Sequence, residues 1–527
     1  MVQILEYYVM KKHLLTTASA LTLLLATQAS ANDITIDQRG TDNKLSTTQT
    51  AGQAGLIVID QIGKGSVAEV TQVDTFAAGD ATANSADIDQ DGIAQAVVVQ
   101  NAGADGIRNT ATIDQFSDAD SIVVSPEEVT EDTILFSVDA DINQTGSGGI
   151  ASIIQGRADL RVSAARANVV QDGLDNKAYV EQYGLSSIAS VDQSNEDNLS
   201  NTEQFGDGST ATVFQTGNDA ESNITQGGTE NSAIVNQSGD SAVSNVWQFG
   251  SSGEVIVDQI GTRNKSNVTQ QSTTGGDVKA VVNQSGSDNL STIFQGKGPN
   301  GNLITKGLVV VTQSGTNGKS TVTQWRNDAS TVKVNQSGSN NISEIEQEDS
   351  GSLADVLQEG ESGTSIINQI SLLDGDGNRI GVYQNSATVT TKATAINTLS
   401  TINQNGYNSI AEVSQSGGIS GDTPSVVSTI KQSGNTKATV FQSSPGSNNV
   451  VDINQLNSNT GVISTAWVEQ TAGSDHTAKV YQTGSGHQAF IYQSGGNNEA
   501  IINQHVTTAA YAHVIQSGFG NFATISQ

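Results

Sequence analysis

A glutamine recurs at a fixed spacing over most of this chain. From Gln171 to Gln270 it returns in nine steps of eleven residues, at Gln182, Gln193, Gln204, Gln215, Gln226, Gln237, Gln248 and Gln259. The same unit, with occasional insertions, begins at Gln38, ends at Gln527 and occurs 39 times. Two places before the glutamine, 37 of these units have Ile or Val. A repeat of this length predicts a stacked architecture, because each unit can bury its apolar residues only against its neighbours.

Within each unit, two kinds of residue alternate. Between positions 289 and 295, one set consists of Asn289, Ser291, Ile293 and Gln295. Alternation predicts a β-strand with one inward face, because successive side chains of a strand point to opposite sides. The Gly, Ser, Asp and Asn residues between these segments are typical of turns.

Eleven residues thus provide one strand of about six or seven residues and one turn of about four. Two such arms make a coil of about 22 residues. We predict an all-β chain, an amyloid-like β-solenoid of stacked strand-turn-strand coils. The composition, with 35% hydrophobic and 4% aromatic residues, fits a narrow stacked core better than several globular cores.

The inward glutamines have a predicted structural role. Stacked amides can bond to one another along the stack, donor to acceptor, which satisfies a buried polar column. We therefore expect the ten glutamines from Gln171 to Gln270 to form a ladder. A second polar column is predicted at the start of the strands, from Asn43, Asn198, Asn289, Asn341, Asn498 and Asn521.

The first 31 residues have a different character from the repeats. Lys11 and Lys12 give a basic start, Leu14–Ala26 is an apolar run, and Ala29–Ala31 resembles a cleavage signal. These features predict a secretory signal peptide over residues 1–31, with translation starting at Met10 after an upstream extension. Residues 32–527 are predicted to form one repeat domain with insertions near 116–141 and 385–401. No other long apolar run occurs, so we expect no integral membrane segment in the mature chain.

Charge and cysteine content exclude some functions. The net charge of −31 argues against nucleic acid as a partner, because phosphate binding needs clustered cations. The chain has no Cys, so its durability outside the cell would depend on hydrogen bonding rather than on disulfides.

Few residues indicate chemistry. His476, His487, His505 and His513 are the histidines beyond the signal peptide, and the first two stand where Asn or Ser usually occurs, so we interpret them as members of the polar column rather than metal ligands. The segment Asp374–Asn378 resembles the start of a calcium loop, but the glycine and the bidentate glutamate that complete such a loop are missing. No nucleophile-elbow motif occurs. We therefore predict no catalytic residues, no cofactor, no metal site and no enzyme activity.

Two segments carry a family resemblance. Asn231–Gly239 reads NSAIVNQSG and Gln516–Gln527 reads QSGFGNFATISQ. Their pattern of Gln-x-Gly-x-Gly-Asn-x-Ala-x3-Gln resembles the repeat of curlins, the secreted subunits of bacterial curli amyloid fibres. The resemblance extends over nearly all of residues 32–527, as in a many-repeat member. It implies export through an outer-membrane pore, nucleation by a nucleator subunit at the cell surface, and polymerisation into biofilm fibres.

We therefore expect a secreted, cell-surface structural protein that assembles end to end with copies of itself into extracellular amyloid fibres for biofilm matrix and adhesion. The repeat stops at Gln527 in mid-pattern, and an uncapped coil would be a template for another molecule. The alternative is a monomeric, surface-displayed β-solenoid adhesin that binds carbohydrate or host and matrix surfaces through the insertion Ser125–Asp141. Ice binding ranks third, because the outward positions mix Thr with Asn, Asp, Lys and Phe.

Overall fold

The structure is a computed structural model. It describes residues 21–23, 33–50, 55–73, 84–102, 109–116, 138–156, 164–271, 278–296, 306–325, 328–348, 351–370, 385–391, 397–405, 408–417, 426–444, 448–457, 462–505 and 508–527. The chain divides into two compact units, Met1–Phe249 and Gly250–Gln527, and each is described by itself.

Unit 1 consists of parallel strands in two sheets. Sheet A contains β1 (Leu21–Leu23), β3 (Lys44–Thr50), β5 (Val67–Val73), β7 (Ala94–Ala102), β9 (Val138–Ser147), β11 (Arg166–Leu174), β13 (Ile188–Glu196), β15 (Thr210–Gln215) and β17 (Ser232–Gln237). Sheet B contains β2 (Asp33–Thr41), β4 (Leu56–Lys64), β6 (Ser85–Asp91), β8 (Thr110–Phe116), β10 (Ile150–Gln155), β12 (Lys177–Gln182), β14 (Leu199–Gln204), β16 (Glu221–Thr229) and β18 (Val243–Ser251), whose last two residues lie past the unit boundary.

Unit 2 repeats this arrangement. Its sheet A strands are β19 (Gly253–Gln259), β21 (Val278–Gln284), β23 (Lys306–Gln313), β25 (Asp328–Gln336), β27 (Leu353–Gln358), β29 (Ser386–Thr391), β31 (Ile410–Gly417), β33 (Thr436–Ser444), β35 (Ser464–Thr471), β37 (Gln488–Gly496) and β39 (Tyr511–Phe519). Its sheet B strands are β20 (Lys265–Gln271), β22 (Leu290–Gly296), β24 (Lys319–Trp325), β26 (Ile342–Gln347), β28 (Thr364–Ile370), β30 (Thr398–Asn405), β32 (Val426–Ser433), β34 (Asn449–Leu456), β36 (Thr477–Thr483), β38 (Glu499–Gln504) and β40 (Phe522–Ser526).

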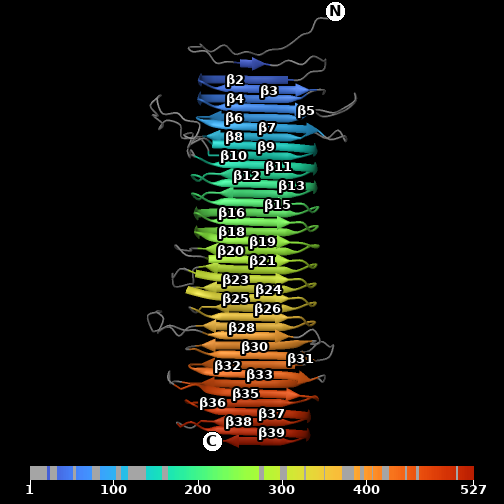
Figure 1. Cartoon of the computed structure of the whole chain (residues 1–527), viewed down its shortest axis with the longest axis vertical. Helices are drawn as coiled ribbons and strands as arrows, with labels where there is room; N and C mark the ends of the chain where they lie inside the picture. The colour runs from blue at the N-terminus through green and yellow to red at the C-terminus, as the bar shows by residue number, and fades with distance from the viewer. Residues whose placement is uncertain are drawn as a thin grey trace, which may run out of the picture. The chain divides into compact units, whose positions relative to one another are not determined.

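The chain alternates between the two sheets, so each strand pairs with the strand two places further along. β11 pairs with β13 and β13 with β15, in parallel and with glutamine opposite glutamine. Within each unit the strands therefore lie layer on layer (Figure 1). The described residues form no helix, and successive strands of a sheet are about 23 residues apart. The predicted all-β solenoid is confirmed.

Coil length varies more than the eleven-residue beat suggests. The paired glutamines Gln171 and Gln193 are 22 residues apart. Gln270 and Gln295 are 25 residues apart, and Gln100 and Gln144 are 44 apart. The register of the strands is nevertheless preserved, because the extra residues lie between strands rather than within them.

The core is a narrow stripe between the two sheets. In β22 the inward Ser291, Ile293 and Gln295 are at most 1% exposed, as is Asn289 just before the strand. The outward residues Leu290, Thr292 and Phe294 are half-buried, each flanked by a residue of the strand on either side. Each buried Ile or Val contributes about 1.5–3 kcal/mol, and the stripe repeats this contribution in every coil.

The turns explain the other regular positions of the unit. Asp288, which precedes Asn289, has a φ of 58°, a conformation that Asp and Asn tolerate better than most residues. Gly286 follows its glutamine by two places, and a Cβ there would lie 1.7 Å from the carbonyl oxygen of Gly315 in the next coil. Glycine recurs at this position because successive turns approach too closely for a side chain.

The predicted signal peptide and the predicted insertion near 116–141 lie largely outside the described residues, whereas most of 385–401 is described. Within the signal peptide, Leu21–Leu23 forms β1, which pairs with Leu45–Thr47 of β3. Of the insertion near 116–141, the structure describes only Phe116 at the end of β8 and 138–141 in β9. Within 385–401, residues Ser386–Thr391 form β29. Among the described residues, no helix has the length and apolar character needed to cross a membrane.

Candidate functional site

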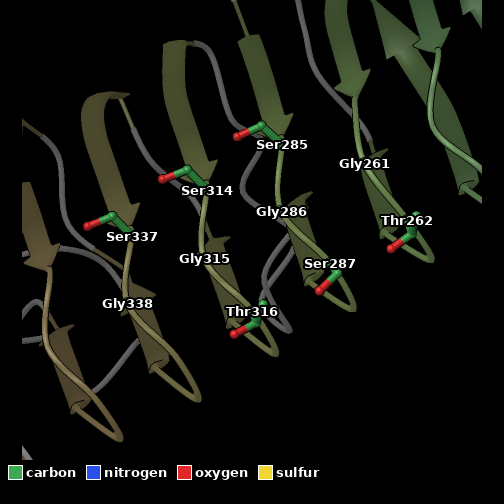
Figure 2. A pocket seen from close by; sticks show the side chains of 10 residues that line it. All are labelled: Gly261, Thr262, Ser285, Gly286, Ser287, Ser314, Gly315, Thr316, Ser337 and Gly338. Carbon is green, nitrogen blue, oxygen red and sulfur yellow. The ribbon is translucent and has the colours of Figure 1, made fainter.

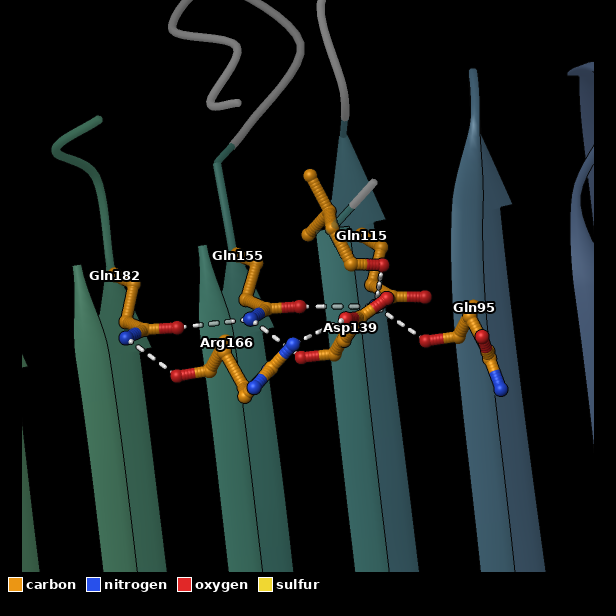
Figure 3. Close-up of polar contacts among 7 residues, drawn as sticks. Gln95, Gln115, Asp139, Gln155, Arg166 and Gln182 are labelled. Atoms are coloured by element: carbon orange, nitrogen blue, oxygen red, sulfur yellow. Dashed lines mark hydrogen bonds and ion pairs between the residues drawn. The ribbon is translucent and has the colours of Figure 1, made fainter. Parts of the chain in front are cut away.

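The inward glutamines lie over one another and bond in series. Gln115 Nε2 donates to Gln155 Oε1 at 2.9 Å, and Gln155 Nε2 donates to Gln182 Oε1 at 2.8 Å (Figure 3). All three side chains are fully buried. In each described hydrogen bond between two repeat glutamines, the glutamine that comes earlier in the chain is the donor. The ladder therefore has a direction.

Each glutamine also links the two sheets, which the sequence did not reveal. Gln204 Nε2 donates to the backbone carbonyls of Ile188 at 3.0 Å and Ser209 at 3.1 Å, both on or beside the opposite sheet. A carbonyl oxygen can only accept a hydrogen bond, so these two carbonyls require that Nε2 of the glutamine, and not Oε1, faces them. The direction of the ladder is therefore set by the backbone.

Within each unit, the structure brings the predicted ladder glutamines into two columns, one on each sheet. In unit 1 the bonds run Gln171 to Gln193 to Gln215 to Gln237, and Gln182 to Gln204 to Gln226 to Gln248. In unit 2, Gln259 donates to Gln284 and Gln270 donates to Gln295. All ten side chains are at most 2% exposed.

The predicted asparagines bond differently from the glutamines. Asn198 Oδ1 accepts the backbone N–H of Ala220, which holds the equivalent position one coil further on, at 3.0 Å. Its Nδ2 donates to the Ser194 carbonyl four residues earlier, at 2.7 Å. Asn198 thus closes its own turn and supports the next one, a local role typical of Asn in turns. Asn289 and Asn341 instead direct Nδ2 to the next coil, to the carbonyls of Gly315 and Gly360.

The other predicted asparagines follow this pattern with small variations. Five are buried and Asn521, in the last coil, is partly exposed. The backbone N–H groups accepted are those of Ser66 by Asn43, Gly318 by Asn289, Gly363 by Asn341 and Asn521 by Asn498. Asn521 Nδ2 donates both to Asn498 Oδ1 and to the Ser517 carbonyl.

The ladder of sheet A is interrupted in unit 2. Thr391 of β29 is opposite Gln358 and Gln415, where a glutamine would complete the column. Gln358 Nε2 donates instead to Ser365 Oγ at 3.1 Å, and Gln415 Oε1 accepts from Ser400 Oγ at 2.8 Å. Gln384, one of the 39 repeat glutamines of the sequence, lies outside the described residues.

Unit 1 carries a column of carboxylates on its outer face. Asp37, Asp60, Asp89 and Asp114 are in register on β2, β4, β6 and β8. Burial raises the pKa of Asp89 to about 6, with a further increase from the neighbouring carboxylates, first among them Asp60. Burial likewise raises the pKa of Asp114. In the sequence, each of these aspartates directly precedes a repeat glutamine. The common register of the aspartates follows only from the pairing of the strands.

The turns of unit 2 form an open groove of about 470 Å³ (Figure 2). Its lining consists of glycines and of serine and threonine hydroxyls from four successive coils, for example Ser285, Gly286 and Ser314. The groove therefore results from the stacking of similar turns.

Metal chemistry has no assembled site in the part of the chain that the structure describes. No group of three or more His, Cys, Asp or Glu residues there could hold a metal ion. The calcium-like segment Asp374–Asn378 lies outside the described residues. His476 and His487 precede β36 and β37, which belong to different sheets, and both side chains are buried.

The coil formed by β39 and β40 has a partly uncovered core. β39 pairs through one edge with β37, and β40 through one edge with β38. The inward Ile525 of β40 is partly exposed, whereas the equivalent Ile502 of β38 is fully buried. At the start of unit 1, Ile36 of β2 is likewise partly exposed, while Ile59 of β4 is 1% exposed.

The paired sheets and their amide ladders define a β-solenoid protein with a repeat of two strands per coil. Residues 473–505 match the curlin associated repeat family, and this stretch contains the ladder residues Gln482, Gln493 and Gln504. Residues 473–505 thus carry a curlin associated repeat, which supports the predicted resemblance. Comparison with curated proteins gives no match.

Proposed function

We propose that this chain is a secreted, curli-like structural subunit that assembles end to end into extracellular fibres. The curlin repeat and the solenoid fold fit a curli-like structural protein. The observation that carries the proposal is the repetition of matched coils inside each unit, where parallel strands and amide ladders join each coil to the next in the same register, so that a coil presents a surface that an identical coil can cover. A second copy is the occupant whose coil matches such a surface strand for strand.

The amide ladder gives this contact a polarity. Gln527 Nε2 donates to the Tyr511 carbonyl at 3.1 Å, and its position in the ladder directs the same N–H₂ group away from Gln504. In unit 1, Gln38 Nε2 donates to Gln61 Oε1, which leaves the Oε1 of Gln38 directed away from Gln61. A head-to-tail contact between two copies therefore brings a donor from one ladder to an acceptor of the other.

The predicted signal peptide would affect when assembly begins. β1 lies inside residues 1–31 and pairs with β3, on the edge that β5 does not use. Removal of the signal peptide would free that edge for a strand of another copy. Export, cell-surface location and a role in biofilm matrix and adhesion are the expectations that accompany the curlin resemblance, as are the nucleator subunit and the export pore.

The test is a time course of residues 32–527 by electron microscopy with thioflavin fluorescence. Ile525→Glu places a charge on the uncovered core stripe and should slow elongation at least tenfold. Thr524→Glu, on the outward face of the same strand, is the matched control and should have little effect. Filaments that lengthen with time support the proposal. A wild-type chain that stays monomeric would favour the adhesin alternative, and equal effects of the two variants would show that this coil is not the growing surface.

A further inference from the structure

Two histidines occupy places that asparagines fill in other coils. His476 precedes β36 and His487 precedes β37, and both are 0% exposed. The residues before them, Asp475 and Gly486, have φ values of 61° and 72°, as residues before the asparagines do. The backbone conformation therefore places the two imidazoles in the same column as the turn-closing asparagines.

His487 reproduces the hydrogen bonds of an asparagine. Its Nε2 lies 3.1 Å from the Thr483 carbonyl, four residues earlier, and its Nδ1 accepts the N–H of Ala510 at 3.3 Å. Asn498 makes the same two contacts, to the Ser494 carbonyl and from the N–H of Asn521. A carbonyl requires a donor and an N–H group requires an acceptor, so these two contacts fit the tautomer that carries its proton on Nε2.

Protonation of His487 would break one of these contacts. A proton on Nδ1 turns the acceptor of the Ala510 N–H into a second donor, so two N–H groups would face each other inside the turn. The imidazolium would also be a buried charge, which is costly without a close anionic partner.

His476 is sensitive to protons for a different reason. Among the described residues, no hydrogen bond of normal geometry reaches either ring nitrogen, although the backbone groups of Ala472 and Gly495 lie close enough to influence the ring. Burial lowers the pKa of His476, and this effect outweighs the backbone groups of Ala472 and Gly495 and the charge of Asp475, all of which raise the pKa. The sign follows from linkage: the unfolded chain binds a proton more readily, so stability is complete above pH ~6.5 and falls as the pH drops below that value.

The charged and titratable groups around the two rings lie mainly outside the core. The strands packed around His476 carry, at outward positions, Asp452, Lys479, Tyr481 and Glu499. Those around His487 carry Glu469, Tyr492, Tyr511 and His513, and His505 Nδ1 lies 3.3 Å from the hydroxyl of Thr483.

We propose that His476 and His487 form a pH-sensitive switch, and that the coils from β36 to β40 unfold locally when these histidines are protonated in mild acid. The switch acts on the folding of these coils, so the inference holds whether or not the chain assembles into fibres. An asparagine at both positions would keep the turn closed and remove the response to protons.

Hydrogen exchange read by mass spectrometry on residues 32–527 tests this inference. Exchange is measured at pH 5.0 and 7.5 and corrected for intrinsic exchange rates, and peptides from β36 to β38 should then exchange faster at the lower pH. Each histidine that stays neutral in the closed coil contributes up to about a 30-fold increase in the opening equilibrium constant. The double variant His476→Asn with His487→Asn should lose this difference. The double variant of the exposed residues, His505→Asn with His513→Asn, is the control and should retain it.

The inference is overturned if wild-type peptides are equally protected at both pH values, or if the buried double variant keeps the wild-type response. Should the double variant be unfolded at pH 7.5, His487→Asn alone serves as the test, because Asn498 makes the same two hydrogen bonds in an equivalent turn. The single variant should then reduce the response, and an unchanged response would contradict the role of His487.

Discussion

At the residue scale, the repeat glutamine acts as a cross-link in two directions. Gln215 is fully buried, accepts from Gln193, and donates to Gln237 and to the backbone carbonyls of Leu199 and Ala220. A hydrophobic residue of the same length would fill the space but satisfy none of these groups. The glutamine is thus retained for its amide rather than for its size.

Gln215→Leu should destabilise the coils around it. Buried groups that lose a hydrogen-bond partner cost about 1–3 kcal/mol each, so a loss of roughly 2 kcal/mol or more is expected. Hydrogen exchange of peptides from β13, β15 and β17 measures this loss. Phe214→Leu, at an outward position that is 43% exposed, is the control. Equal losses of protection in the two variants would contradict the inward role of the amide.

A buried hydroxyl in the apolar stripe gives a prediction of the opposite sign. Ser222 is fully buried, and its Oγ has no hydrogen-bond partner among the described residues. Ala178 and Ala189 hold the equivalent position in other coils of unit 1. Ser222→Ala should therefore stabilise the coil by about 0.5–1 kcal/mol, measured by thermal unfolding. Ser232→Ala, at an outward position, should have a smaller effect, and a destabilised Ser222→Ala would show that the hydroxyl has a role in the fold.

The sequence predicted the residues of the ladder better than their bonds. Eleven-residue spacing indicates which glutamines lie over one another, because position within a strand determines the facing side. The bonds from Gln204 to Ile188 and Ser209 depend on the distance between two sheets, which no local pattern contains. The turn-closing role of Asn198 likewise depends on the approach of the next coil.

At the element scale, β29 shows how one strand departs from the repeat. The segment from Asn385 to Thr391 keeps the buried asparagine, Ala387 and Val389 at their usual places and changes only the final residue. In the sequence, Val382 and Gln384 also match the end of a repeat unit, but both lie outside the described residues. The complete pattern from Asn385 onward was the signal that identifies β29, since it fills every inward position except the last.

Thr391→Gln should repair the interrupted ladder. The new amide would accept from Gln358 and donate to Gln415, which now depend on the hydroxyls of Ser365 and Ser400. We expect a gain of about 1–2 kcal/mol and greater protection of β27, β29 and β31 in hydrogen exchange. Thr390→Gln, on the outward face of β29, is the control. No gain for Thr391→Gln over this control would mean that the serine bonds already satisfy the two amides.

At the scale of the whole molecule, charge makes stability depend on pH. Because the pKa of Asp89 is raised to about 6, its ionised form opposes folding above that pH. This cost is removed as the pH falls from about 6 toward 4, so protection of β4, β6 and β8 should increase over that range. Asp89→Asn should raise their protection at pH 7.5 and weaken the pH dependence. Glu203→Gln, an outward charge change on β14, should do neither, and an Asp89→Asn variant that matches it would contradict the role of the carboxylate column.

The two units therefore respond to acid in opposite ways. Mild acid relieves repulsion in the aspartate column of unit 1, whereas it would open the coils that contain His476 and His487 in unit 2. Neither response follows from the net charge of −31, because both depend on which residues the strand register brings together. Composition predicted the sign of the surface charge, and only the paired strands locate the groups that titrate.

Coils stack along one axis within each unit, and we propose that copies of the chain add to one another along such an axis. X-ray diffraction from aligned filaments of residues 32–527 tests it most directly. The account predicts a reflection at ~4.7–4.8 Å along the filament axis, because strands of successive coils lie perpendicular to that axis. A 4.7–4.8 Å reflection perpendicular to the filament axis would contradict it, because the molecules would then associate side by side rather than end to end.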